Sequence, residues 1–386
     1  MGIYWRGEYW VQVDLPFGLV SAPRIFSQVS TAIKDEVLRL LPPGLTDVQI
    51  LCYLDDYFII STSKAHTTAA VGTLVATCAE LGLEIHLGKS VRPGRVCEWL
   101  GVTLDVHQGL MYLSASRCDK LVQALDAVLG RKKATRHSLE KLLGRLNWAA
   151  RVVHGGFTFM RSLINTSTKV SRAGHLCTLT AENKSDLEWW SAAVRNMKGV
   201  PLHAMQGGRP LVPSSHNMTD ACGGEVGHSG VGGFFNGVGW CAKFTASQCT
   251  WDINMKELVG GLWQLERYAS LWAGHRVVLG MDNQVSVGWI NRLTARPPCA
   301  LLAVKRIWWL CQHHDIELAP VHIPGVDNDL ADALSRYDFD RYAHHLELWQ
   351  AEHTVLGGTL TVREAVTRYT SEGGRTQEGL VAPVCA

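Results

Sequence analysis

Apolar and polar positions in the first 160 residues follow two spacings, one typical of helices and one of strands. An apolar residue recurs at i, i+3, i+4 and i+7 over Leu139, Leu142, Leu143, Leu146, Ala149, Val152 and Val153. This spacing predicts a helix with one buried face, and Thr135 ahead of it predicts the N-cap. Two further helices are expected over 23–41 and 65–81, because Pro42-Pro43-Gly44 and Gly82 end them.

Strand-forming residues are gathered in short runs between these helices. Residues 49–53 and 57–61 flank Leu54-Asp55-Asp56, which predicts a hairpin with acidic residues at its tip. A second hairpin is expected from Cys97–Asp105 and Leu110–Leu113, with its turn at 107–109.

The pattern changes after Gln206–Pro210, a segment with the composition of a linker. Strands are expected near 216–220, 230–236, 238–244, 276–281 and 316–321, and helices near 252–270, 283–292, 298–314 and 328–336. This order predicts a mixed sheet flanked by helices. The whole chain is therefore expected to be a multidomain protein of the α+β and α/β classes.

Length and composition agree with two or three globular domains. The chain has 386 residues, of which 47% are hydrophobic and 19% charged, which excludes a largely disordered or collagen-like chain. The net charge is only +2, yet residues 117–161 hold ten lysines and arginines against three acids. This basic stretch is either a solvated helix surface or a face that follows phosphates.

The cysteines and the N-terminus bear on cellular location. The eleven cysteines contain no C-x2-C pair, which favours reduced thiols and an intracellular protein, cytoplasmic or nuclear. The N-terminus does not show the basic start and following apolar segment that are typical of a signal peptide. No apolar run approaches the ~20 residues that span a bilayer, so no membrane partner is expected.

The adjacent acids Asp55 and Asp56 are the first candidate for chemistry. Two neighbouring carboxylates repel each other unless a cation neutralises them, and hard oxygen ligands suit Mg²⁺ or Mn²⁺. A solvated turn is the alternative, since Asp is common in turns. The surrounding motifs favour the metal: Leu15–Pro23, Tyr53, Gly82–Ser90 with Lys89, and Trp99-Leu100-Gly101. Their order and spacing resemble the reverse transcriptases of long-terminal-repeat-type and related retroelements.

The resemblance implies a role for each matching position. Asp55 and Asp56 would be catalytic metal ligands for Mg²⁺, with Mn²⁺ as an alternative. The substrate-binding residues would be Phe17 and Gly18 at the template and incoming nucleotide, Tyr53 beside the primer end, Lys89 near the leaving pyrophosphate, and Trp99 and Gly101 in the primer grip. Such enzymes also need an Asp on an earlier strand, whereas Ile3–Trp10 already resembles the hairpin that follows that strand. We therefore expect an N-terminally truncated palm with an incomplete polymerase site, for which activity of this chain alone is doubtful.

A second set of acids lies in the C-terminal half. Asp220 and Asp282 end predicted strands, which is where open α/β sheets place ligands, and Glu257 lies on a predicted helix. Each acid alone is as easily a cap or a surface residue. The stretch His322–Arg336 resembles the closing segment of retroelement ribonuclease H domains. That resemblance implies that Asp220, Glu257, Asp282 and Asp332 are catalytic metal ligands and that His322 assists proton handling or product release. Asn254 also fits, while Asp327 and Asp329 are interpreted as helix-start acids.

These motifs predict four segments: a truncated reverse transcriptase palm at 1–113, a helical thumb and connection at 114–205, a ribonuclease H-like domain at 211–336, and a tail of unknown role at 337–386. The connection around 139–163, with Trp189-Trp190, resembles DIRS-like retrotransposons, which use a tyrosine recombinase.

The expected function is that of an RNA-directed DNA polymerase with ribonuclease H activity, cleaving RNA in RNA–DNA hybrids by two-metal hydrolysis. The expected partners are an RNA template, an RNA–DNA hybrid and a DNA primer, with deoxynucleotides if the polymerase half is completed. The alternative is a catalytically inactive, domesticated or decayed remnant that only binds nucleic acid.

Overall fold

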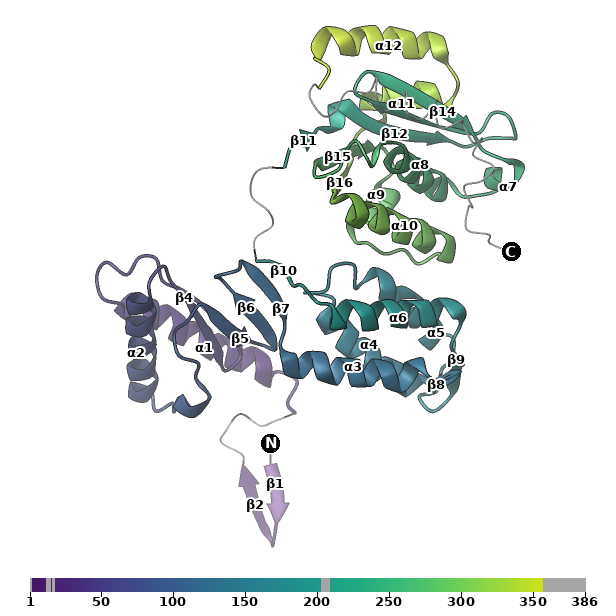
Figure 1. Ribbon diagram of the computed structural model, residues 1–386. Helices are drawn as coiled ribbons and strands as arrows, with labels where there is room; N and C mark the ends of the chain where they lie inside the picture. The colour runs from purple at the N-terminus through teal and green to yellow at the C-terminus, as the bar shows by residue number, and fades with distance from the viewer. Residues whose placement is uncertain (1, 12–14, 16–17, 203–208, 357–386) are drawn as a thin grey trace. The chain divides into compact units, whose positions relative to one another are not determined.

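The computed structural model describes residues 2–11, 15, 18–202 and 209–356 (Figure 1). The chain clusters into two compact units that divide between Met111 and Tyr112. The expected linker at 206–208 lies outside the described residues. The predicted multidomain α+β and α/β class is confirmed by the helices and sheets of the two units. Within the described residues, no helix is both long and apolar enough to cross a bilayer.

The first unit contains two hairpins and two helices that the sequence predicts to within two residues. Its elements are β1 (Gly2–Trp5), β2 (Glu8–Val11), α1 (Ala22–Leu40), β3 (Gln49–Tyr53), β4 (Asp56–Ile60), α2 (Lys64–Glu80) and the 3-10 turn η1 (Leu87–Lys89). β1 pairs with β2 and β3 with β4, both antiparallel. The helices pack on the second hairpin through Ile33, Val37, Ile50 and Leu74. This core fixes the hairpin that ends in Asp55 and Asp56.

The strand expected at 97–105 is wrong, because a turn divides it. β5 (Val96–Trp99) and β6 (Val102–Asp105) form a tight hairpin around Leu100-Gly101, and β7 (Leu110–Leu113) follows. Leu100 has φ +51° and Gly101 has φ +80°. A two-residue turn with both φ values positive matches the right-handed twist of the strands it joins. Gly101 is therefore a turn residue here.

The first part of the second unit is helical. It comprises α3 (Ala115–Leu129), β8 (Lys133–Thr135), α4 (Arg136–Ala149), η2 (Thr158–Met160), α5 (Arg161–Ser167), β9 (Leu176–Thr178), α6 (Ala181–Arg195) and β10 (Val200–Pro201). The predicted cap is confirmed, because Thr135 accepts a hydrogen bond from the Ser138 backbone N–H. The helix ends at Ala149 and does not continue to 153 as expected. Val152 and Val153 are nevertheless buried, in the turn that follows.

A six-stranded mixed sheet forms the second part of this unit. Its strands are β11 (Leu211–Val212), β12 (Asn217–Cys222), β13 (Gly230–Phe235), β14 (Val238–Lys243), β15 (Arg276–Met281) and β16 (Glu317–His322). β12, β13 and β14 are antiparallel neighbours. β15 pairs in parallel with β16 on one side. On its other side, its first residues pair in parallel with β11 and its last residues with β12. The predicted mixed sheet is confirmed.

Helices cover both faces of this sheet (Figure 1). Below it in the view lie α8 (Ile253–Tyr268), α9 (Gln284–Asn291) and α10 (Pro298–His314), and above it lie α11 (Asp329–Ser335) and α12 (Phe339–Glu352). The short α7 (Ala246–Cys249) precedes α8, and the 3-10 turns η3 (Ser214–His216) and η4 (Gly325–Asp327) precede β12 and α11. α12 belongs to the segment to which the sequence assigned no role. It packs through Trp349 on Phe234, and the Trp349 indole donates to the Ser215 carbonyl at 2.7 Å.

The helical part and the sheet part of the second unit meet at α10 around a buried charge. Lys305 of α10 donates to Asp186 of α6 at 2.7 Å and to Glu182 at 3.0 Å. Ser162 donates to the other oxygen of Asp186 at 2.5 Å. Phe159 stacks on Trp189 with ring centres 4.0 Å apart and lies under the Lys305 ammonium. The charge is thus satisfied only while the two parts are packed together.

We predict that Lys305→Met lowers the free energy of unfolding by about 3 kcal/mol, because it leaves Asp186 buried without its cation. Chemical denaturation of the purified chain measures this loss. The matched control is Arg306→Gln on the next residue. The Arg306 side chain is 55% exposed in its pair with Glu266, so this variant is expected to lose less than about 1 kcal/mol. Equal losses for the two variants would contradict the assignment.

Candidate functional site

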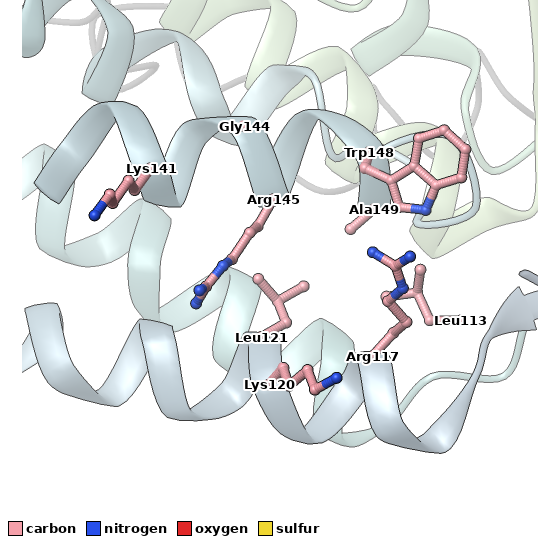
Figure 2. Close-up of a pocket in the computed structure, with 9 residues that line it drawn as sticks. All are labelled: Leu113, Arg117, Lys120, Leu121, Lys141, Gly144, Arg145, Trp148 and Ala149. Carbon is pink, nitrogen blue, oxygen red and sulfur yellow. The ribbon is translucent and has the colours of Figure 1, made fainter. Parts of the chain in front are cut away.

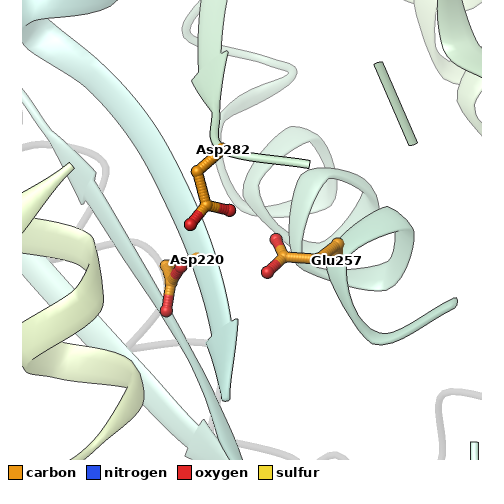
Figure 3. Close-up of side chains that lie close together, drawn as sticks. All are labelled: Asp220, Glu257 and Asp282. Atoms are coloured by element: carbon orange, nitrogen blue, oxygen red, sulfur yellow. The ribbon is translucent and has the colours of Figure 1, made fainter. Parts of the chain in front are cut away.

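Three carboxylates converge at one end of the mixed sheet. Asp220 lies in the interior of β12, not at its end as expected, and Asp282 directly follows β15. Thr219 pairs with Met281 in the parallel ladder, so the next residue on each strand is an acid. Glu257 faces both from α8, as Figure 3 shows.

The three acids are close and largely dry. One oxygen of each lies within 4.8 Å of the others, and Asp220 and Glu257 are both 3% exposed. Asp220 accepts a hydrogen bond from the Ser335 hydroxyl at 2.5 Å, and Glu257 Oε1 accepts one from the Ala221 backbone N–H at 3.2 Å. Glu257 Oε2 is buried and has no hydrogen-bond partner in the described part of the chain. A buried oxygen left in this state is costly unless a ligand takes it.

The electrostatics of the three acids point to a cation. Burial raises the pKa of Asp220 to about 7; the Ser335 hydrogen bond opposes the rise, and the charges of Asp282 and Asp332 add to it. Burial, followed by the charges of Asp220 and Asp282, raises the pKa of Glu257 to about 10. A divalent cation would remove this repulsion, and three carboxylates with a spare oxygen are a donor set that suits Mg²⁺ or Mn²⁺. The residues therefore fit a hard divalent ion.

Asp332, the fourth predicted ligand, lies outside this group of three. Arg336 donates to its Oδ1 at 2.6 Å and Arg341 of α12 donates to its Oδ2 at 2.6 Å. Both oxygens of Asp332 are therefore engaged by guanidinium groups. Of the four predicted ligands, the structure brings three close together, and Asp332 is not one of them.

The other residues expected near this site lie on neighbouring elements. His322 is the exposed last residue of β16 and pairs with Met281, the residue before Asp282 in the chain. The Asn254 side chain accepts a hydrogen bond from Asn283 at 3.1 Å, one turn before Glu257. Asp329 begins α11, as expected for a helix-start acid, and Asp327 lies in η4.

Sequence reasoning missed three residues that contact the site or its strands. Ser335 reaches Asp220, and its position three residues after Asp332 on the same helix was the available signal. Asn328 is fully buried and donates to the Thr219 carbonyl at 3.0 Å, while its own oxygen has no partner in the described structure. Arg341 lies beyond the motif, and no spacing rule indicated it.

The acidic pair of the first unit is at the tip of the β3–β4 hairpin, as predicted. Asp55 and Asp56 are exposed, and Tyr53, 56% exposed, pairs with Asp56. Leu54 adopts φ +53°, which is strained for a side chain of this kind, and the Ser30 hydroxyl of α1 donates to its carbonyl at 2.5 Å. Among the described residues, no third metal-ligating side chain joins this pair.

The remaining predicted positions lie at turns and edges of the first unit. Gly18 has φ +85°, which favours glycine, and Lys89 is exposed at the end of η1. Trp99 stacks on Phe58 of β4 with ring centres 5.0 Å apart, so it joins the β5–β6 hairpin to the acidic hairpin. Phe17 lies outside the described residues.

Comparison with a family model decides the identity of the first unit. Residues 5–104 match the model described as reverse transcriptase (RNA-dependent DNA polymerase). These residues carry a reverse transcriptase domain. Asp55, in the turn of the β3–β4 hairpin, and Asp56, the first residue of β4, therefore lie within the matched residues.

Three similar solved structures are of a foamy viral protease-reverse transcriptase, two in complex with double-stranded DNA and one with an RNA/DNA hybrid. Identity is 16% or 17% and the TM-score is 0.43 in each. The matches cover 83% of this chain and 52%, 62% and 40% of those chains. The chain thus spans about half the length of the proteins that it resembles.

Beyond the reverse transcriptase domain, α3 and α4 enclose a basic pocket of about 290 Å³. Arg117 and Lys120 of α3 and Lys141 and Arg145 of α4 line it with Trp148, and Figure 2 shows Arg117 and Arg145 entering the gap from opposite helices. The Trp148 indole nitrogen is buried without a hydrogen-bond partner in the described chain. The pocket therefore offers four cationic side chains to an anionic ligand.

We predict that metal-free protein loses stability as pH rises. The folded state keeps a proton on Glu257 up to a pKa of about 10, whereas the unfolded chain releases it near 4.5, so unfolding gains favour throughout that window. Between pH 7.5 and 9 Asp220 adds little, because its pKa is about 7. Glu257→Gln should remove most of the slope in urea unfolding with a chelator, whereas the exposed Glu347→Gln should keep it. Equal slopes would contradict the account.

Proposed function

We propose that the chain is part of a retroelement reverse transcriptase whose C-terminal sheet cleaves the RNA strand of RNA–DNA hybrids in the presence of a divalent cation. The observation that carries the proposal is the convergence of Asp220, Glu257 and Asp282, with one buried Glu257 oxygen unpartnered in the described structure. The reverse transcriptase domain at residues 5–104 supports it, since such a domain produces the hybrid that the sheet would cleave.

The chain's own residues would position the reaction. Asp220, Glu257 and Asp282 would hold Mg²⁺, with Mn²⁺ as the alternative, and Asp332 would contribute once released from its arginines. When bound, divalent ions acidify a water molecule and stabilise the oxygen that leaves a phosphodiester. Ser335 and the Ala221 N–H orient Asp220 and Glu257 through hydrogen bonds. His322, exposed at the end of β16, would exchange a proton with solvent.

Substrate selection would depend on the 2′-OH and the groove shape of the hybrid, because only the RNA strand carries that hydroxyl.

In the reverse transcriptase domain, Asp55 and Asp56 would hold a divalent ion together with a further carboxylate. Its substrates would be an RNA template, a DNA primer and deoxynucleotides. Membership of the DIRS-like elements and an intracellular location, cytoplasmic or nuclear, remain part of this proposal.

Asp220→Asn and Asp282→Asn should each reduce magnesium-dependent cleavage of RNA in a labelled hybrid by at least about a hundredfold, because each removes an anionic ligand. Asp340→Asn, an exposed acid of α12, is the matched control and should cleave as the unmodified chain does. Gel analysis of the labelled RNA strand measures the rates. Unchanged cleavage in both site variants would show that these acids are not the centre.

A second candidate, nucleic-acid binding without catalysis, is favoured by the basic pocket between α3 and α4. Replacing Arg117 or Arg145 with Gln should weaken hybrid binding and lower the slope of log affinity against log salt by about one for each phosphate that the variant no longer binds. Arg195→Gln removes the same charge from α6, where Asp126 already pairs with it, and should leave the slope unchanged. Identical slopes in all variants would indicate a solvated surface. Steep binding without metal-dependent turnover would favour the non-catalytic candidate.

A further inference from the structure

We propose that Arg341 of α12 competes with divalent cations for Asp332, so that α12 sets how readily this carboxylate joins the metal site. The inference rests on the proposed metal site of Asp220, Glu257 and Asp282. It assigns a role to a helix that lies beyond every motif that the sequence presents.

The contacts of Arg341 bridge two acids of α11. One guanidinium nitrogen donates to Asp332 Oδ2 at 2.6 Å, and the other is bound to Asp329 Oδ1. Arg336 occupies the second oxygen of Asp332 at 2.6 Å. The Asp332 side chain is 18% exposed and that of Arg341 is 34% exposed, so the pairs are only partly shielded from solvent. Charge-assisted bonds of this length are the stronger kind in proteins.

Asp332 is nonetheless placed to serve the metal site. Ser335, one turn further along α11, donates directly to Asp220, so this face of the helix is turned toward the three acids. The charge of Asp332 reaches Asp220 strongly enough to raise the pKa of that group. Asp332 differs from Glu257, whose spare oxygen has no partner in the described chain, in that both its oxygens already bind arginines.

We expect cations to bind in two stages, because the three acids lack arginine partners whereas Asp332 has two. The three acids gain a cation without losing any bond to a positive group. Asp332 can bind one only by giving up hydrogen bonds to Arg341 or Arg336. The cation that uses Asp332 should therefore bind more weakly than the cation held by the three acids, and removal of Arg341 should strengthen it.

Titration calorimetry with MgCl₂ and MnCl₂ on the full chain, without nucleic acid, tests this. Arg341→Gln should raise the affinity of the weaker binding event by about tenfold, the equivalent of one charge-assisted hydrogen bond. Adding Asp332→Asn to that variant should abolish the gain. Arg306→Gln, which removes a distant arginine paired with Glu266, should change nothing.

Asp329→Asn separates competition from a looser α12. It removes the negative charge of the other anchor of Arg341, which is also the charge facing His345, yet leaves Arg341 on Asp332. We expect no gain in cation affinity from it. A gain equal to that of Arg341→Gln, or no gain in Arg341→Gln, would overturn the inference.

The proposed metal site fails separately. The proposed metal site would be contradicted if the unmodified chain bound no cation, or if Asp282→Asn left the stronger of the two binding events intact. The role of Arg341 alone would be contradicted by the following result. The unmodified chain shows the stronger event, Asp282→Asn loses it, and Arg341→Gln leaves the weaker event unchanged. Circular dichroism melting of every variant confirms that the compared proteins are folded.

Discussion

The repulsion among Asp220, Glu257 and Asp282 is the constraint on which the C-terminal half of this chain depends. Their oxygens lie within 4.8 Å of one another, and two of the three residues are almost fully buried. Such a cluster is expensive without a cation, because like charges at short range cannot all ionise in a dry site. The parallel pairing of β12 with β15 and the packing of α8 against β12 hold the acids together in spite of this cost. This arrangement is the basis of our proposal that the three acids bind a divalent cation.

A second buried carboxylate, that of Asp186, is neutralised by a side chain of the same chain. Asp186 is as deeply buried as Asp220, but Lys305 and Ser162 bind both its oxygens. Asp332 has the same kind of solution through Arg336 and Arg341. By contrast, no lysine or arginine forms an ion pair with Asp220, Glu257 or Asp282 in the described part of the chain. The pairing of Asp186 with Lys305 also explains why α10 joins the helical part to the sheet: the Lys305 pairs exist only in the packed state.

The sequence predicted most of the elements, because their signals are local. Apolar periodicity, Thr135 as a cap and turn residues at Gly82 located helices and strands to within a few residues. It failed at Leu100-Gly101, where a two-residue turn with positive φ interrupts a run that is strand-like throughout. The candidate acids were predicted from expected positions beside strands and from the resemblance to retroelement motifs, although Asp220 lies inside β12 and not at its end. The hydrogen bonds of Arg341 to Asp332 could not be found that way, because they depend on how α12 folds back against α11, a tertiary contact without a local pattern.

Anomalous diffraction from crystals soaked in MnCl₂ tests the central claim most directly, since it locates the ion without relying on activity. The account predicts a strong peak bounded by the side chains of Asp220, Glu257 and Asp282, and its loss in Asp282→Asn crystals. A fully ordered site in which these three carboxylates show no peak, with manganese bound elsewhere, would contradict it.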